Sequence, residues 1–268
     1  MVAALPRLAG MTAVALSAFA TLSVGSATAA PAPAPAPADD PAPLIVGGQD
    51  AQIADHPFVV ALTTPDGQQF CGGSLVAPNK VVTAAHCTSD QQPADVNVVS
   101  GRTNISGTDG KVSKVTGIWV HPQYTDATKG SDVSVLTLDA PVQSPTIPLA
   151  AAGDPSYAAG TDATILGWGT TSEGGSTSDH LKMATVPVNA DNDCKAAYGE
   201  YNPEAMMCAG LPEGGVDACQ GDSGGPIVAD GKLIGVTSWG EGCARPGKPG
   251  IYSRVGTYNK DLTEQINS

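Results

Sequence analysis

Residues 219–226 read C-Q-G-D-S-G-G-P and place Ser223 between an acid and two glycines. A serine hydroxyl attacks a carbonyl efficiently only when a base removes its proton and hydrogen-bond donors hold the resulting oxyanion. Glycine lets backbone N–H groups approach a ligand closely, so Gly221 and Ser223 can present two donors to one oxygen. Taken alone, the run favours a nucleophile only modestly over a Gly-rich surface turn. The choice depends on whether partners for Ser223 occur elsewhere in the chain.

Two residues of the required types precede it. Residues 83–87 read T-A-A-H-C and carry His86, while Asp132 opens the apolar run D-V-S-V-L-T-L. The chain order is therefore His86, Asp132, Ser223. These three motifs in this order resemble the chymotrypsin/trypsin family of serine proteases, closest to secreted trypsin-like enzymes of actinobacterial type. The resemblance extends over residues 45–267.

The resemblance implies a role for each motif. Ser223 attacks the peptide carbonyl, and His86 takes its proton and then delivers it to the leaving amine. Asp132 accepts the other ring N–H of the histidine and fixes its tautomer. The N–H groups of Gly221 and Ser223 form the oxyanion hole. No cofactor is implied.

The same resemblance implies a primary specificity pocket with Asp217 at its base, six residues before Ser223. In trypsin-like relatives the matching acid pairs with a substrate Lys or Arg, and small residues keep the pocket open. Taken alone, Asp217 could be a solvated loop acid. Ala218 stands where animal trypsins commonly carry a serine that helps to bind lysine, so we expect a stronger preference for Arg. The remaining predicted pocket residues are Ser238, Trp239, Gly240 and Gly250.

A further match concerns activation. The sequence I-V-G-G starts at Ile45, and in the family the freed amino group of this isoleucine pairs with the acid just before the nucleophile, here Asp222. A buried carboxylate needs a charged partner, which cleavage supplies. Leu44 is the residue just before the cleavage point, and relatives that activate themselves carry Lys or Arg at this position. We therefore expect that another protease, one that cuts after an apolar residue, matures this protein.

The start of the chain predicts export. Arg7 begins a basic-then-apolar segment that ends in A-T-A at residues 27–29, as in a signal peptide covering residues 1–29. A membrane anchor is the alternative, but the apolar run is short and interrupted by Ser and Thr. Residues 30–44 are rich in Pro and Ala, cannot build a core, and are interpreted as a pro-segment. The mature protein is expected to be secreted and extracellular.

Six cysteines in an exported chain predict three disulfides. Sequence alone leaves the pairing open, and the resemblance selects Cys71–Cys87, Cys194–Cys208 and Cys219–Cys243. A zinc site is disfavoured because no C-x-x-C pair occurs. The other histidines, His56, His121 and His180, lack comparable motifs and are interpreted as surface or structural residues, so no metal site is expected.

Short apolar runs alternate with Gly, Pro, Asn and Asp from residue 45 onward, which is typical of an all-β protein. The resemblance implies two antiparallel Greek-key barrels with the active site between them. We place the first barrel at about residues 45–153, the second at about 154–255 and a helix at about 256–267. The expected strand-forming runs are 58–62, 73–76, 96–99, 115–120, 133–138, 164–166, 183–188, 226–228 and 233–238.

Composition limits the partners. The formal net charge is −13, which argues against nucleic acid. The expected partners are proteins or peptides with Arg or Lys at the cleavage site, together with proteinaceous serine-protease inhibitors. The chain is expected to be a monomer with no membrane association after export.

Two other functional classes are considered. A non-catalytic protein of the same fold usually loses one of the three predicted catalytic residues, and this chain keeps all of them. A serine esterase would carry G-x-S-x-G on an α/β fold with the histidine last in order, and the order here, with His86 first, does not fit. Within the proteases, an elastase-like or chymotrypsin-like preference is the second choice, which Asp217 disfavours.

Overall fold

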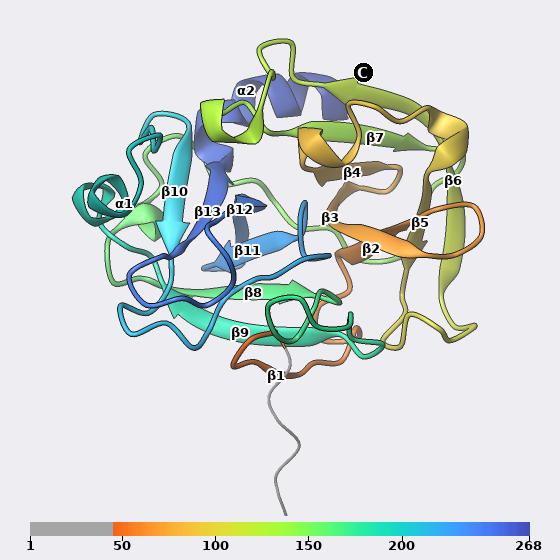
Figure 1. Ribbon diagram of the computed structural model, residues 1–268. Helices are drawn as coiled ribbons and strands as arrows, with labels where there is room; N and C mark the ends of the chain where they lie inside the picture. Colours follow the sequence, from red (N-terminus) through yellow and green to blue (C-terminus); the bar gives the residue numbers. More distant parts are fainter. Residues whose placement is uncertain (1–44) are drawn as a thin grey trace, which may run out of the picture. The chain divides into compact units, whose positions relative to one another are not determined.

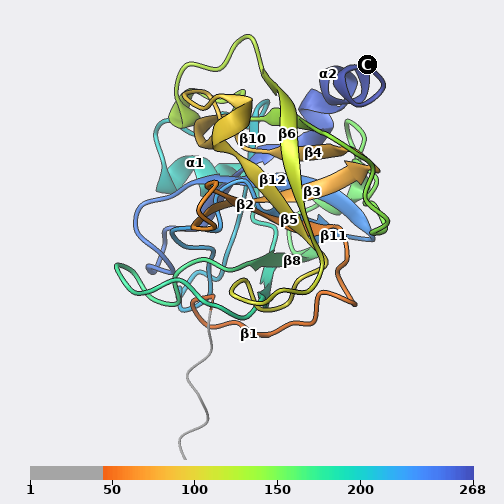
Figure 2. The same cartoon turned by 90° about the vertical axis from the view of Figure 1, so that its right-hand side faces the viewer.

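The computed structural model describes residues 45–268, so the predicted signal peptide and pro-segment lie outside the described residues. The described chain is mostly β, with two barrel-like antiparallel sheets and two α-helices (Figures 1 and 2). The predicted fold class is therefore confirmed. The strands are β1 (Gln49–Asp50), β2 (Val59–Thr63), β3 (Gln69–Ala77), β4 (Lys80–Thr83), β5 (Asn97–Ser100), β6 (Lys111–Val120), β7 (Ser134–Leu138), β8 (Asp162–Gly167), β9 (Lys182–Pro187), β10 (Met206–Ala209), β11 (Pro226–Ala229), β12 (Lys232–Trp239) and β13 (Gly250–Arg254). The helices are α1 (Asp191–Ala197) and α2 (Val255–Ile266).

The first sheet closes on itself in the order β2-β3-β4-β7-β6-β5. Strand β2 shows why this barrel also packs against the second sheet. Val60 and Leu62 point into the barrel core, whereas the alternate residues Val59 and Ala61 join a separate cluster with Trp168. Because side chains alternate between the two faces of a strand, one short apolar strand contributes to two cores at once. Burying each Val or Leu side chain contributes about 1.5–3 kcal/mol.

The second sheet has the order β1-β9-β8-β11-β12-β13-β10. Its core is apolar and consists mainly of small and β-branched side chains from β8, β9, β11 and β12. Strand β1, close to the start of the described chain, pairs with β9 in this sheet, with Gln49 opposite Met183. The N-terminal segment therefore belongs structurally to the second sheet.

Helix α2 extends over residues 255–266 and packs against the first barrel. Val255, Tyr258 and Leu262 lie in the same buried cluster as Val133 and Leu136 of that barrel. Apolar residues at four-residue spacing lie on one face of a helix, which explains this contact. Figure 1 shows α2, in blue, next to β7.

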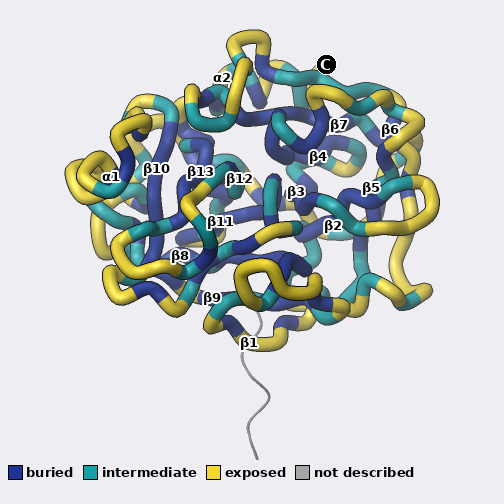
Figure 3. The backbone as a smooth tube through the Cα atoms, viewed as in Figure 1, coloured by how far each residue is buried: buried dark blue, intermediate teal, exposed yellow. Residues whose placement is uncertain are grey.

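Burial follows the sheets closely. The strands are largely buried and the outer loops are exposed (Figure 3). Within residues 45–268, no helix combines the length and the apolar character needed to cross a bilayer.

Candidate active site

His86 and Asp132 meet because their strands are neighbours in the barrel. His86 lies in a short 3-10 helix, Ala85–Cys87, just after β4, and Asp132 lies just before β7. In the β4–β7 pair, Thr83 is opposite Ser134, which brings the two flanking segments together. Asp132 Oδ2 is 2.8 Å from His86 Nδ1, and its Oδ1 accepts the His86 backbone N–H at 2.8 Å.

The Asp132 carboxylate is fully buried and well supplied with donors. In addition to His86, the Ser238 hydroxyl donates to Oδ2 at 2.5 Å. The Ser253 hydroxyl donates to the backbone carbonyl of Asp132 at 2.8 Å. A buried charge persists only with such hydrogen bonds. The predicted pocket residue Ser238 therefore uses its hydroxyl to hold Asp132, and Ser253 is a support that the sequence analysis missed.

A second missed support precedes Asp132. Ser131 has a φ of +59°, in the left-handed region that side-chain-bearing residues rarely adopt. Its N–H donates to the Tyr258 hydroxyl at 2.7 Å. Helix α2 therefore helps to hold the segment that leads into Asp132.

The nucleophile loop, residues 219–226, packs against the first barrel and leads directly into β11. The backbone N–H of Gly72 in β3 donates to the Ser223 carbonyl at 2.7 Å. Gly221 has a φ of +95°, a conformation that favours glycine. The loop thus lies between the two barrels, next to the strands that position His86.

Asp222 points away from the solvent into the second barrel. Its Oδ1 accepts the Gly169 N–H at 2.7 Å and its Oδ2 accepts the Cys219 N–H at 3.0 Å. Burial raises the pKa of this carboxyl to about 6, although the two N–H donors lower it. Asp222 is held by backbone groups and is only 2% exposed.

A pocket of about 130 Å³ opens beside Ser223. The structure brings the predicted specificity residues together here: Asp217, Ala218, Ser238, Trp239, Gly240 and Gly250 all line it, together with Ser223. Asp217 and Gly250 are far apart in the sequence, and the fold brings them to the same pocket.

Asp217 lies buried in this pocket and is 5% exposed. Its Oδ2 accepts the Ala244 N–H at 3.1 Å, whereas its Oδ1 has no hydrogen-bond partner in the described chain. Burial raises the pKa of the Asp217 carboxyl to about 7, partly offset by the N–H groups of Ala244 and Ala218 and increased further by the charge of Asp222. The carboxyl thus has an unused oxygen and too little stabilisation for a free charge, so it is suited to receive a cation.

Gly250 shows how closely the pocket wall approaches this acid. A Cβ atom on Gly250 would lie 2.6 Å from Asp217 Oδ1 and 3.1 Å from the Tyr252 hydroxyl. The first distance is too short for a carbon contact and the second is tight, so a side chain here would force the Asp217 carboxyl to move.

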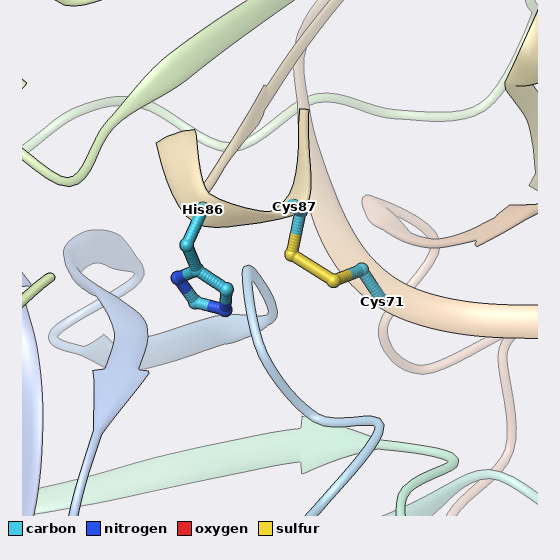
Figure 4. Close-up of side chains that lie close together, drawn as sticks. All are labelled: Cys71, His86 and Cys87. Atoms are coloured by element: carbon cyan, nitrogen blue, oxygen red, sulfur yellow. A yellow bond between two sulfur atoms is a disulfide. The ribbon is translucent and has the colours of Figure 1, made fainter. Parts of the chain in front are cut away.

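The three disulfides link Cys71 to Cys87, Cys194 to Cys208 and Cys219 to Cys243, which confirms the predicted pairing. Figure 4 shows the first of them beside the His86 ring. Two sulfur atoms and a histidine nitrogen lie within 4.8 Å of one another there, but both sulfur atoms are used in the disulfide and offer no thiolate. The third disulfide ties the nucleophile loop to the opposite wall of the pocket.

The other histidines lie elsewhere. His121 is buried, and its Nε2 is 3.2 Å from a carboxylate oxygen of Asp261 on α2. His180 Nδ1 is 3.0 Å from the Leu181 carbonyl. The hydrogen bond of His121 connects two secondary structure elements, which agrees with a structural role.

The site therefore combines a His86–Asp132 pair at the first barrel, a glycine-rich loop that carries Ser223, and a pocket with an acid at its base that residues 217–252 line. The sequence profile of the family described as Trypsin matches residues 45–262. The chain belongs to the trypsin family. Like other members of that family, it is a trypsin-like serine endopeptidase that acts on protein or peptide substrates.

Similar proteins cover most of this trypsin-family chain. A trypsin of Saccharopolyspora erythraea is 71% identical over 224 residues, which are 84% of this chain and 99% of that protein. Trypsin-2 of Salmo salar is 40% identical over 83% of this chain and 95% of its own length. Trypsin eta of Drosophila melanogaster is 38% identical over 84% of this chain and 89% of its own length. The resemblance to an actinobacterial trypsin is therefore confirmed.

Proposed function

We propose that the protein is a secreted endopeptidase that cleaves peptide bonds after Arg, and less efficiently after Lys, and that it is made as an inactive precursor. The observation that carries the specificity is Asp217: a buried carboxyl with one unpartnered oxygen at the base of a small pocket. A dry carboxylate that faces a matching cation discriminates far more sharply than an apolar pocket does. An uncharged substrate side chain would leave the acid buried and unpaired.

The proposed chemistry assigns one role to each residue. Ser223 attacks the carbonyl carbon, His86 removes its proton and passes it to the leaving nitrogen, and Asp132 stabilises the imidazolium. The 2.8 Å contact between the His86 ring and Asp132 supports this assignment. Water then repeats the sequence on the acyl-enzyme. The N–H groups of Gly221 and Ser223 hold the oxyanion in both steps.

The preference for Arg follows from the pocket wall. Ala218 offers no hydroxyl, so a lysine ammonium would reach Asp217 without this extra acceptor, whereas an arginine fork can engage the carboxylate with two N–H groups. We expect kcat/KM on matched peptide amides to fall in the order Arg, Lys, then Phe and Ala far below. A serine-directed inhibitor should abolish all of it. Equal values for the Arg and Lys amides would contradict the proposed preference, and equal values for all four would contradict the proposed function.

We also propose that cleavage before Ile45 activates the precursor. Ile45 is fully buried and has a φ of +57°, which is strained for a β-branched residue in the uncut chain. Its neighbour Val46 already pairs with the backbone of Asp217. A freed ammonium at Ile45 would provide the cation that the buried Asp222 carboxylate otherwise lacks.

The precursor is not expected to activate itself. Leu44 does not fit a pocket built around Asp217, so mixing the active enzyme with purified precursor should leave the bond between Leu44 and Ile45 intact. A protease that cuts after apolar residues should instead generate an Ile45 N-terminus and full activity. N-terminal sequencing and an amidase assay on the same samples measure both events. Efficient cleavage by the active enzyme itself would contradict this expectation.

The remaining parts of the proposal concern the whole chain. We propose a signal peptide at residues 1–29 and a pro-segment at 30–44, with a peptidase domain at 45–268 that divides near residue 154. Three disulfides fit an extracellular protein. The mature enzyme is proposed to be a monomer, free of membranes and nucleic acid, that proteinaceous serine-protease inhibitors can block.

A further inference from the structure

The Gln69 side chain reaches the nucleophile loop from the other barrel. Gln69 is the first residue of β3, and its Nε2 donates to the Gly221 carbonyl at 2.8 Å. The same nitrogen donates to the Cys71 carbonyl at 3.1 Å, which ties the amide to its own strand. The side chain is therefore a fixed hydrogen-bonded bridge between the first barrel and the loop that carries Ser223.

Two peptide units meet at Gly221, and each is held by one donor. The peptide unit between Gln220 and Gly221 contains the Gly221 N–H. The carbonyl of this unit, which belongs to Gln220, accepts the Thr170 N–H at 2.7 Å. The unit after Gly221 contains the Gly221 carbonyl, which Gln69 binds. Gly221 itself has a φ of +95° and no side chain to restrict rotation between the two units. Gln69 therefore supplies the restriction that glycine lacks.

The Gln69 amide does not serve stability alone. Its Oε1 is buried and has no hydrogen-bond partner in the described part of the chain. An apolar side chain of similar size would remove this unpaired acceptor, but it would also take the donor away from the Gly221 carbonyl. The donor contact with the loop that carries Ser223 is therefore what this amide provides and an apolar side chain would not.

We propose that Gln69 is a positioning residue for the oxyanion hole, acting through the Gly221 carbonyl to keep the Gly221 N–H directed at the substrate oxygen. This inference rests on the proposed function, which assigns the N–H groups of Gly221 and Ser223 to the oxyanion. Losing an oxyanion donor outright lowers kcat by about 10²–10³-fold in comparable enzymes. Losing the support of one donor has a smaller effect.

The test uses the mature enzyme and the Gln69→Leu variant, with Gln68→Leu as a matched control because Gln68 is the adjacent, exposed glutamine. We expect Gln69→Leu to lower kcat on an arginyl amide about tenfold with KM nearly unchanged. Gln68→Leu should retain both values. Thermal unfolding of all three proteins should be closely similar.

Two inhibitors separate positioning from structure. Benzamidine needs only the Asp217 pocket, so its affinity should be the same for parent and variant. A peptide aldehyde that ends in argininal also reacts with the nucleophile. Ser223 Oγ adds to the aldehyde carbon, the hydroxyl proton passes to His86, and the aldehyde oxygen becomes the oxyanion. Its affinity should fall by about the same factor as kcat, because transition-state analogues follow the loss of transition-state binding.

A second variant makes the test stricter. Gln69→Glu places an oxygen without a proton against the Gly221 carbonyl and should lower kcat more than Gln69→Leu does. If kcat and the aldehyde affinity were unchanged in both variants, the inference about Gln69 would be overturned. The proposed function would stand in that case, because the parent enzyme would still be active. A parallel loss of benzamidine affinity and thermal stability would also overturn it, since the residue would then be merely structural. An inactive parent enzyme would contradict both proposals.

Discussion

Replacing Ser223 with alanine is expected to lower kcat on an arginyl amide on the order of 10⁶-fold, close to the residual rate that binding and oxyanion stabilisation provide. The physical reason is that the proposed mechanism uses the Ser223 hydroxyl, which lines the Asp217 pocket, as the nucleophile. His86 would still bind Asp132, but it would have no hydroxyl proton to accept.

Binding distinguishes loss of the nucleophile from loss of the fold. Ser223→Ala keeps the pocket, so it should bind benzamidine with the affinity of the parent and unfold at a similar temperature. His86→Ala should reduce kcat by a comparable factor, and the double variant should be no slower than either single variant, because the residues act as a unit. Substantial activity in Ser223→Ala, measured after removal of contaminating protease, would exclude the assigned nucleophile.

Neutralising the pocket is the second large effect. Asp217→Asn is expected to lower kcat/KM for arginyl amides roughly 10⁴-fold, because the guanidinium would then be buried without a counter-charge. Activity on a phenylalanyl amide should change little, so the ratio of the two values is the decisive measurement. Asp162→Asn, at an exposed acid of β8, serves as the control and should behave as the parent does. An unchanged ratio in Asp217→Asn would refute the role of this acid.

Because the pKa of Asp217 is raised, the affinity of the pocket for a cation is expected to depend on pH. Burial raises this pKa to about 7 in the free pocket, so the carboxyl carries a proton below that pH. A cationic ligand requires the ionised form. Benzamidine affinity should therefore be greatest above pH 7 and fall as the pH decreases through about 7, and Asp217→Asn should bind weakly at every pH. The sign follows from the raised value: protonation of Asp217 in the free protein competes with the ligand.

The sequence predicted the parts of the site that depend on short motifs. The contexts of Ser223, His86 and Asp132 lie within a few residues of each, and the helix at 255–266 has a clear four-residue spacing. The disulfides followed from the family resemblance rather than from spacing. These features are local or shared by a family, so a single sequence carries them.

Other parts depend on contacts that no short stretch contains. Strand β10 reads M-M-C-A, with no β-branched residue, and becomes a strand because β13 pairs with it. Helix α1 is short, and the sequence analysis did not identify it. Gln69 and Ser253 look like ordinary strand residues in the sequence. Their roles appear only when folding brings Gln69 to Gly221 and Ser253 to Asp132.

Each end of the described chain joins the half of the fold that the other part of the sequence forms. Strand β1 pairs at the edge of the second sheet, and α2 packs into the core of the first barrel. Neither half can therefore be finished from its own stretch of sequence. We expect the mature protein to melt in a single cooperative step, since separating the halves would remove an edge strand from one and a helix with a buried apolar face from the other. Helix α2 adds Val255, Tyr258 and Leu262 to the core of a barrel whose strands lie at residues 59–138, so that core is not complete until α2 has been synthesised. Late completion of this core suits a polypeptide for which a signal peptide at residues 1–29 is proposed.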